Sequence, residues 1–257
     1  MSKRNTPQRR HAILALLAEQ GEVSVDQLAK AFETSEVTIR KDLTALEKSG
    51  LLLRRYGGAV PMPHELISEP SQPLSPYKQA IAAAAAGCIR DPARIIIDSG
   101  STTAAMIPQL GHKPGLVVMT NSLNVARALS ELEHEPVLLM TGGTWDPHSE
   151  SFQGQVAEQV LRSYDFDQLF IGADGIDLAR GTTTFNEFLG LSRVMAEVAR
   201  EVIVLVESDK IGRKIPNLEL PWSSIHTLIT DERLALEARE QITARGIILI
   251  CAAVPVK

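Results

Sequence analysis

Hydrophobic positions in the first sixty residues recur at helical spacing, and the pattern then changes to that of short strands. Thr6-Pro7 favours a helix start and Gly21 favours a stop, which predicts a first helix between them. Residues 24–27, Ser-Val-Asp-Gln, have the spacing of a capping box and predict the start of a second helix. After a turn, Ser35 can cap a third helix that runs to about Ser49.

A strand, a tight turn and a return follow the third helix. Residues 51–56, Leu-Leu-Leu-Arg-Arg-Tyr, read as a strand, Gly57-Gly58 as the turn and residues 59–60 as the return. Three helices and a hairpin predict a small α+β winged helix-turn-helix domain over residues 1–60. Five prolines follow in residues 61–76 and cannot propagate a helix or a central strand, so we expect a linker there.

Beyond the linker, residues 77–257 alternate apolar runs of strand length with helical stretches. The runs predict strands at Ile95–Asp98, Leu116–Thr120, Val137–Thr141, Gln168–Gly172, Val202–Glu207, Thr227–Thr230 and Ile247–Cys251. Helices are predicted near residues 77–90, 103–110, 122–131, 155–163, 186–200 and 232–245. Apolar strands joined by helical crossovers predict a Rossmann-like, mostly parallel α/β domain with helices on both faces of its sheet.

Charge differs between the two predicted domains, although the whole chain has a formal net charge of -5. Residues 1–60 carry 10 Lys and Arg against 7 Asp and Glu, whereas the remainder carries 16 against 24. A basic amino-terminal domain followed by an acidic domain is typical of a DNA-binding protein with a separate second domain. Chance variation between segments also produces such a difference in charge.

Two further features of the sequence bear on its surroundings. No apolar stretch approaches the roughly 20 residues that a membrane helix needs. Cys88 and Cys251 are the only cysteines, and they indicate neither a disulfide framework nor a metal cluster. We therefore expect a cytoplasmic protein with no membrane partner.

The third predicted helix has one apolar face and one basic face. On a wheel of about 100° per residue, Ile39, Leu43 and Leu46 share a narrow face that must pack on the first two helices. The opposite side carries Val37, Lys41, Thr44 and Lys48, and Thr38 and Arg40 flank it. Such a face suits the DNA major groove, because cations neutralise phosphates and short side chains allow close approach to base edges. A solvated basic face on an ordinary three-helix domain has the same pattern.

Two strings in this domain resemble the DeoR family of bacterial repressors. They are Ser35–Leu43, Ser-Glu-Val-Thr-Ile-Arg-Lys-Asp-Leu, and Arg54–Ala59, Arg-Arg-Tyr-Gly-Gly-Ala. The family pattern is a Thr-Ile-Arg-Arg/Lys-Asp-Leu recognition helix followed by a Gly-Gly wing. Together, the wheel and the resemblance give the DNA-binding candidates Ser35, Glu36, Val37, Thr38, Arg40, Lys41, Thr44, Arg54, Arg55 and Tyr56.

These candidates differ in their expected roles. The resemblance implies that Thr38, Arg40 and Lys41 make general DNA contacts, and that Glu36 and Val37 discriminate between operators. The neighbouring Asp42 lies near the buried face of the wheel, so we expect it to form a structural ion pair or a wing contact.

Polar or glycine-rich turns follow five of the predicted strands of the second domain. They lie at residues 98–103, 120–122, 141–144, 172–175 and 207–210. Ligands of open parallel sheets bind outside the carboxyl ends of the strands, so the five turns would converge on one polar-ligand site. Taken singly, each turn is as readily a plain connection.

The turn at residues 98–103, Asp-Ser-Gly-Ser-Thr-Thr, is the best candidate for an anion site. Glycine lets the backbone bend, hydroxyls donate, and the following helix offers free N–H groups and a positive dipole end. Lys210 would add a charge for a phosphate, and Asp98, Asn121 and Asp174 suit sugar hydroxyls. The effector-binding candidates are Asp98, Ser99, Gly100, Ser101, Thr102, Thr103, Asn121, Ser122, Gly142, Gly143, Asp174, Gly175 and Lys210.

Residues 77–252 resemble the C-terminal sensor of the DeoR family, which shares a fold with ribose-5-phosphate isomerase and glucosamine-6-phosphate deaminase. The resemblance implies a repressor of a sugar or polyol operon that a phosphorylated sugar or polyol releases from its operator. Strings at residues 118–123, 151–155 and 183–187, among others, are similar to glucitol (sorbitol) operon repressors, which favours glucitol 6-phosphate. Amino-sugar members share part of these strings. We also expect self-association through this domain, as a dimer or tetramer.

The alternative is a sugar-phosphate isomerase or deaminase with a DNA-binding appendage. Its proton transfers need a carboxylate base near the substrate carbon and usually a second acid. The isomerases carry a cluster resembling Asp-Gly-Ala-Asp-Glu, whereas residues 172–177 read Gly-Ala-Asp-Gly-Ile-Asp, with Ile176 where further acid is needed. We therefore expect no enzyme activity, although Glu187 is a candidate substitute. His112, His134 and His148 lack metal-ligand spacing, so we expect no metal or cofactor.

Overall fold

A computed structural model of the chain describes residues 6–48, 51–55, 57–61, 74–91, 93–147, 149–184, 186, 189–213 and 215–254. The chain divides into two compact units, residues 1–72 and 73–257. Within the predicted linker, residues 62–73 lie outside the described residues, whereas Pro61 ends a strand and Pro76 begins a helix. Among the described residues, no helix is long and apolar enough to cross a membrane.

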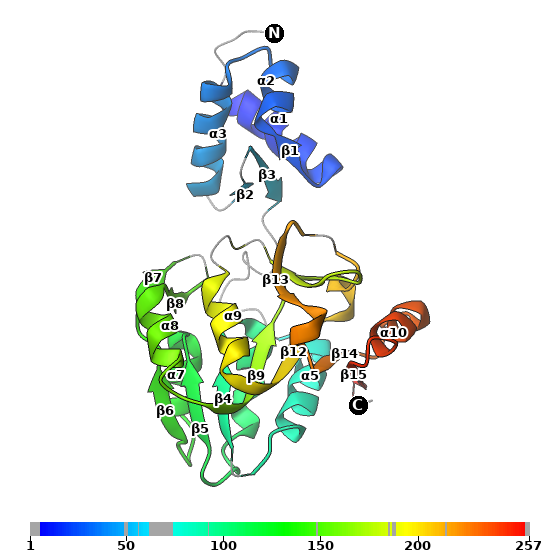
Figure 1. Cartoon of the computed structure of the whole chain (residues 1–257). Coiled ribbons are helices and arrows are strands. Elements are labelled where there is room, and N and C mark those ends of the chain that lie inside the picture. Colours follow the sequence, from blue (N-terminus) through cyan, green and yellow to red (C-terminus); the bar gives the residue numbers. More distant parts are fainter. Residues whose placement is uncertain are drawn as a thin grey trace. The chain divides into compact units, whose positions relative to one another are not determined.

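The first unit consists of three helices and a small antiparallel sheet (Figure 1). Its elements are α1 (Thr6–Gln20), β1 (Val23–Ser24), α2 (Val25–Ala31), α3 (Glu36–Lys48), β2 (Leu52–Arg55) and β3 (Gly58–Pro61), with the strands in the order β1-β3-β2. The predicted capping box is present, because Ser24 Oγ accepts from Gln27 N and Gln27 Oε1 accepts from Ser24 N, each over 3.1 Å. Gly57 turns the hairpin with a φ of +80°. The winged helix-turn-helix prediction is therefore confirmed, and β1 is an additional strand.

Seven strands of the second unit form one wholly parallel sheet. They are β4 (Arg94–Ile97), β5 (Val117–Thr120), β6 (Val137–Met140), β9 (Phe166–Gly172), β12 (Ala199–Leu205), β14 (Thr227–Asp231) and β15 (Ile248–Ala252). Their order is β15-β14-β12-β9-β4-β5-β6. Each of the seven predicted strands is present, and the chain order reverses direction across the sheet between β4 and β9.

Helices cover both faces of this sheet, as predicted (Figure 1). Ile95 and Ile97 of β4 join one apolar cluster, whereas Ile96 between them joins the other, because successive strand residues point to opposite faces. The first cluster packs on α5 (Pro76–Gly87), α6 (Ser101–Ala104) and α7 (Leu123–Ser130), and the second on α8 (Gln155–Leu161), α9 (Gly190–Glu197) and α10 (Leu236–Thr243).

Short elements complete the second unit and differ from the sequence prediction. They are the hairpin β7 (Thr144–Asp146) and β8 (Ser151–Gln153), the antiparallel sheet of β10 (Gly175–Asp177), β11 (Gly181–Thr184) and β13 (Asn217–Pro221), and the 3-10 turns η1 (Ile107–Gln109), η2 (Ser208–Lys210) and η3 (Trp222–Ser224). The helix predicted over residues 103–110 is only the single turn α6 followed by η1. Pro108 has no N–H to continue a helical ladder.

Candidate DNA interface and effector site

Helix α3 places its apolar side in the core and its basic side in solvent. Ile39 and Leu43 are fully buried in the cluster that joins the three helices. On the other side, Val37 is 58% exposed, and Arg40 and Lys41 are exposed beside it. With Thr44 and Ala45, these three residues border one shallow depression of the surface. The geometry matches the amphipathic wheel and leaves the basic face of α3 accessible.

The amino-terminal end of α3 is capped as predicted. Ser35 Oγ accepts from Thr38 N over 3.2 Å and lies 2.9 Å from Thr38 Oγ1. Arg40 Nη2 lies 2.6 Å from Glu36 Oε2, and both side chains are about half exposed. Exposed ion pairs contribute little to stability, so Arg40 can exchange Glu36 for a phosphate at small cost.

The first strand of the wing is attached to α3 through Arg54. Its Nη1 donates to Thr44 Oγ1 over 2.9 Å, and its backbone N donates to Glu47 Oε1 over 3.2 Å. Arg55 lies 3.8 Å from Glu22, and partial burial lowers the pKa of its guanidinium. Tyr56, the remaining wing candidate, lies outside the described residues. The hydrogen bonds of Arg54 and Thr44 place the wing and the basic face of α3 in one structural unit.

Asp42 forms the structural ion pair that its place on the wheel predicts. Its carboxylate is 3% exposed and accepts from Arg9 Nε over 2.6 Å and from Arg10 Nε over 2.9 Å. Both arginines lie on α1, so this pairing binds α3 to the first helix. Arg9 and Arg10 lie 33 and 32 residues before Asp42, and no local pattern marks them as its partners.

The five polar turns of the second unit meet at the carboxyl edge of the parallel sheet. The turn of Asp98 follows β4, and the turn of Asp174 follows the neighbouring β9. The turns after β5, β6 and β12 flank them on either side. The order of connections reverses between β4 and β9, and the crevice at such a switch point is where open α/β sheets bind ligands.

The turn at residues 98–103 is ordered by its own hydrogen bonds. Thr103 Oγ1 donates to the carbonyl oxygens of Asp98 and Gly100 over 2.8 and 2.9 Å, and Asn121 Oδ1 accepts from Ser99 N over 3.2 Å. Thr102 and Thr103 are buried, whereas Gly100 and Ser101 are exposed. Helix α6 is only four residues long, so the predicted helix dipole is small. An anion here would depend on hydroxyls, backbone N–H groups and a nearby cation.

Several other effector candidates have structural roles. Ser122 is buried and caps α7 by accepting from Val125 N over 3.4 Å. Gly143 has a φ of +112°, and a Cβ there would lie 2.5 Å from Gln153 O, so it permits the β7–β8 hairpin together with Gly142. Gly175 begins β10, with a Cβ position only 3.0 Å from Thr183 Oγ1. These residues shape the edge of the candidate site.

Asp174 and Lys210 both lie at the switch point. Thr184 Oγ1 donates to Asp174 Oδ2 over 2.6 Å. Lys210 is 7% exposed, and its Nζ donates to Ala173 O over 3.4 Å. Glu187, the candidate substitute acid, lies outside the described residues, as does His148. Within the described residues, no group of His, Cys, Asp and Glu could hold a metal ion.

Lys78 is a basic residue of the site that is not among the candidates predicted from the sequence. It lies in the first turn of α5, and its Nζ donates to Ser101 Oγ over 3.0 Å. This ammonium therefore reaches the same turn in which we predicted an anion. Lys78 and Ser101 are 23 residues apart, so no local sequence pattern predicts their contact. Only the folded sheet brings α5 to the end of β4.

Glu219 is a second residue of the site that no sequence pattern predicts. It lies on β13, is 8% exposed, and accepts from Ser192 Oγ over 2.8 Å. Burial, with the negative charges of Asp98 and Asp174, raises the pKa of Glu219 to about 8. Burial also raises the pKa of Asp98 to about 6, and Asp174 adds a smaller contribution. Three carboxyl groups thus interact at the switch point, and Glu219 is mostly neutral at pH 7.

Both units match known protein families. Residues 9–63 match the DeoR-like helix-turn-helix domain, and residues 75–232 match the DeoR C-terminal sensor domain. A protein of Escherichia coli O157:H7 named "Putative aga operon transcriptional repressor" is 38% identical over 252 residues, which cover 95% of this chain and 93% of that protein. The "Uncharacterized HTH-type transcriptional regulator YgbI" of Escherichia coli strain K12 is 30% identical over 250 residues, covering 95% and 97%.

Similarity to solved structures is lower. Ribose 5-phosphate isomerase A from Methanocaldococcus jannaschii is 20% identical to this chain, with a TM-score of 0.38 over 52% of this chain and 53% of that one. The two relatives above are named as transcriptional regulators, and neither name is that of an enzyme.

Proposed function

Since the chain belongs to the DeoR family of transcriptional regulators, we propose that it represses a sugar or polyol operon and leaves its operator when a phosphorylated sugar or polyol binds. The observation that carries the DNA half of this proposal is the exposed basic face of α3, held against the core by buried residues on its other side. The observation that carries the effector half is the meeting of polar turns at the β4–β9 switch point.

In this proposal α3 enters the major groove of double-stranded operator DNA. Thr38, Arg40 and Lys41 make general contacts, and Glu36 and Val37 at the exposed start of the helix discriminate between operators. Ser35 orients the helix as its cap, and Thr44 and Arg54 link it to the wing. The wing, with Arg54, Arg55 and Tyr56, lies along the phosphate backbone.

The effector's phosphate binds at the turn of Ser99, Gly100 and Ser101, with a lysine as counter-charge. Lys78 is in hydrogen-bond contact with this turn, and Lys210 lies near Asp174. The carboxylates of Asp98 and Asp174 accept hydrogen bonds from sugar or polyol hydroxyls. Thr102, Thr103, Asn121, Ser122, Gly142, Gly143 and Gly175 hold the turns in shape.

Glucitol 6-phosphate is the effector that we propose to test first, because the local strings named above are similar to glucitol operon repressors. Amino-sugar phosphates form the second arm, since amino-sugar members of the family share part of those strings. We further propose that copies of the chain associate through the second unit as a dimer or tetramer, and that they act in the compartment that holds the DNA.

The alternative function, a sugar-phosphate isomerase or deaminase, rests on the buried acid Glu219 beside Asp98 and Asp174. The names of the relatives speak against it. The test is to incubate the purified chain with ribose 5-phosphate, glucosamine 6-phosphate and glucitol 6-phosphate. Turnover of any of them would support the enzymatic alternative.

The DNA half is tested by replacing both Arg40 and Lys41 with alanine. An operator selected from random duplexes should bind more weakly, and the slope of affinity against salt should fall by about two, one for each lost phosphate contact. Arg127→Ala is the matched control, because Arg127 is also an exposed helical arginine paired with a glutamate four residues away. If the double variant keeps the affinity and salt slope of the control, the recognition-helix assignment is wrong.

The effector half is tested by ligand-induced stabilisation of the second unit. Both tryptophans, Trp145 and Trp222, lie in that unit, so their fluorescence follows its unfolding. A bound phosphorylated compound should raise the unfolding temperature. Combined Ser99→Ala and Ser101→Ala should remove the rise, whereas Ser130→Ala at the end of α7 should keep it.

A further inference from the structure

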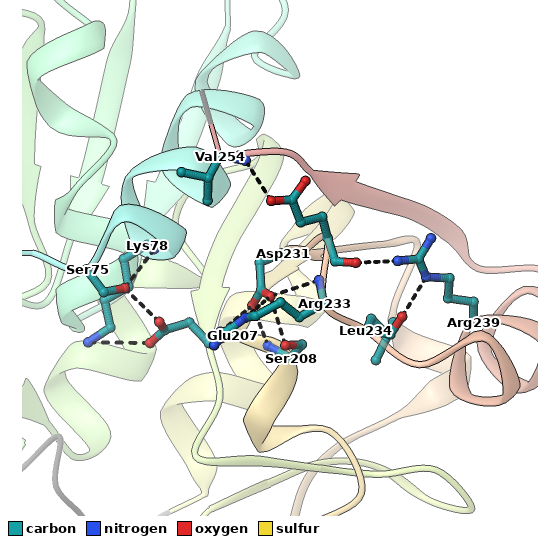
Figure 2. Close-up of polar contacts among 10 residues, drawn as sticks. Ser75, Lys78, Glu207, Ser208, Asp231, Arg233, Leu234, Arg239 and Val254 are labelled. Atoms are coloured by element: carbon teal, nitrogen blue, oxygen red, sulfur yellow. Dashed lines mark hydrogen bonds and ion pairs between the residues drawn. The ribbon is translucent and has the colours of Figure 1, made fainter. Parts of the chain in front are cut away.

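The first turn of α5 is attached to the loop after β12 through one carboxylate (Figure 2). Ser75, the N-cap of α5, donates from Oγ to Glu207 Oε1 over 2.7 Å and accepts from Lys78 N over 3.1 Å. Lys78 Nζ lies 3.8 Å from the other oxygen, Glu207 Oε2. Glu207 therefore holds both the cap of the helix and the lysine one turn later.

A second contact holds the same turn from the loop after β14. Arg233 Cζ lies 3.5 Å from the ring centroid of Tyr77, and Arg233 Nε donates to the buried Asp231 over 2.7 Å. Asp231 also accepts from the backbone N and hydroxyl of Ser208, the neighbour of Glu207 (Figure 2). Among the described residues, no hydrogen bond or ion pair joins Arg233, Asp231 or Ser208 to the turn of residues 98–103, so this second contact is separate from the turn in which we predict the phosphate.

Lys78, in contrast, contacts both the turn of residues 98–103 and Glu207. Its Nζ donates to Ser101 Oγ over 3.0 Å while it faces Glu207, and the side chains of Lys78 and Glu207 are each 14% exposed. A phosphate at Ser101 carries up to two negative charges against the single charge of Glu207, and it would lie nearer to the ammonium. Coulomb attraction between partly buried charges is only weakly screened, so the phosphate competes well for Lys78 and also repels Glu207.

Ser75 lies near the start of the second unit, where the chain continues from the DNA-binding unit. The second unit begins at Pro73, and Ser75 is the cap of its first helix. A change in the Ser75–Glu207 hydrogen bond therefore acts on the segment through which any signal between the two units must pass along the chain.

We propose that Glu207 is the positioning residue that transmits effector binding: a phosphate at Ser101 takes Lys78 from Glu207, and Glu207 then releases the Ser75 cap at the entry to the sensor unit. The inference rests on the proposed function and adds its route of regulation. In this scheme the Ser75–Glu207–Lys78 arrangement belongs to the state that binds the operator. Breaking it without ligand mimics the liganded state.

The experiment compares operator affinity and ligand affinity in the full chain, with glucitol 6-phosphate and glucosamine 6-phosphate as the probes. In the wild type, the active probe should weaken operator binding about tenfold or more, a typical size for allosteric coupling. Ser75→Ala and Glu207→Gln should bind the operator weakly without ligand and respond to the probe by less than about threefold. Lys78→Met should lose affinity for the probe itself.

Reciprocity gives a readout that a merely structural role would not move. If Ser75→Ala favours the liganded state, it must bind the probe more tightly than the wild type does, although it neither touches the ligand nor changes the charge. Ser75→Thr keeps the hydroxyl and should restore wild-type coupling. Asp209→Asn removes a carboxylate from the same loop that pairs with Arg213 instead, and it controls for the loss of negative charge in Glu207→Gln.

The outcomes separate the two claims. If the wild type binds neither probe, or binds one without operator release, the proposed function fails for these effectors and the inference fails with it. If the wild type responds and Ser75→Ala responds equally, with unchanged probe affinity, the transmission route is wrong while the proposed function stands. Loss of coupling in Ser75→Ala, rescue by Ser75→Thr and tighter probe binding support the route.

Discussion

Replacing Asp42 with alanine should loosen α3 from the first helix and unfold the DNA-binding unit at a lower temperature. The carboxylate is 3% exposed and accepts two charge-assisted hydrogen bonds, from Arg9 and Arg10, whose side chains are 11% and 37% exposed. Hydrogen bonds to charged groups contribute roughly 1.5–3 kcal/mol each, and the exposure of Arg10 discounts its share. We therefore expect a loss of about 3 kcal/mol, the lower limit for breaking a buried pair.

Such a loss is large for a domain of this size, because each kcal/mol lowers the midpoint of a 60–100-residue domain by roughly 4–8 °C. The expected shift is therefore about 12–24 °C. Circular dichroism reports both units, whereas tryptophan fluorescence reports only the second, since Trp145 and Trp222 both lie there. Asp42→Ala should lower the dichroism transition and leave the fluorescence transition in place.

Asp26→Ala is the matched control for this measurement. Asp26 also accepts from a cationic side chain, Lys30 at 2.8 Å, but both side chains are mostly exposed. Asp26→Ala should leave the midpoint of the dichroism transition unchanged within error, because solvent screens exposed ion pairs. A midpoint for Asp42→Ala that matches this control would show that buried pairing with α1 does not hold α3 in place.

Two other substitutions test the second unit. The folded state holds a proton on Glu219 up to a pKa of about 8, against an ordinary value of 4.5, so this group adds stability at low pH that is lost as pH rises through 8. Between pH 5 and 8 the loss should amount to about 3.5 kcal/mol at most, and urea unfolding of Glu219→Gln should depend less on pH; an unchanged dependence would place the titration elsewhere. Gly143→Ala should cost about 2 kcal/mol or more, because its φ of +112° is strained for alanine and its Cβ would lie 2.5 Å from Gln153 O. The control Gly87→Ala has open space around its Cβ and should unfold no earlier than the wild type in the same thermal scan.

Local signals along the sequence predicted much of the fold. The caps at Ser24 and Ser35 are predictable because each depends only on a serine hydroxyl and a backbone N–H three residues later. The structure has both caps. The seven parallel strands were recoverable because strands buried on both faces are continuous apolar runs. The strand β11, Gly-Thr-Thr-Thr, carries no such run, so the hydrophobic pattern does not predict it.

The candidate site was less predictable, because its partners are remote in sequence. Asp42 was expected to be paired, but Arg9 and Arg10 lie 33 and 32 residues away. Lys78 and Glu219 come from elements with no motif of their own, and they reach the switch point only through the order of the sheet. Conversely, the sequence predicts that the hydroxyls of Thr103 and Ser122 bind the ligand. In the structure, Thr103 Oγ1 donates within its own turn, and Ser122 Oγ caps α7.

In the proposed function, a phosphorylated sugar or polyol controls operator binding by this chain. The direct measurement is fluorescence anisotropy of a labelled operator, selected from random duplexes, while the full chain is titrated with glucitol 6-phosphate, amino-sugar phosphates and their unphosphorylated forms at one salt concentration. We predict that at least one phosphorylated compound weakens binding about tenfold or more, while its unphosphorylated form has no effect. Operator binding that no phosphorylated compound changes, or affinity no greater than for a scrambled duplex, would contradict the proposed function.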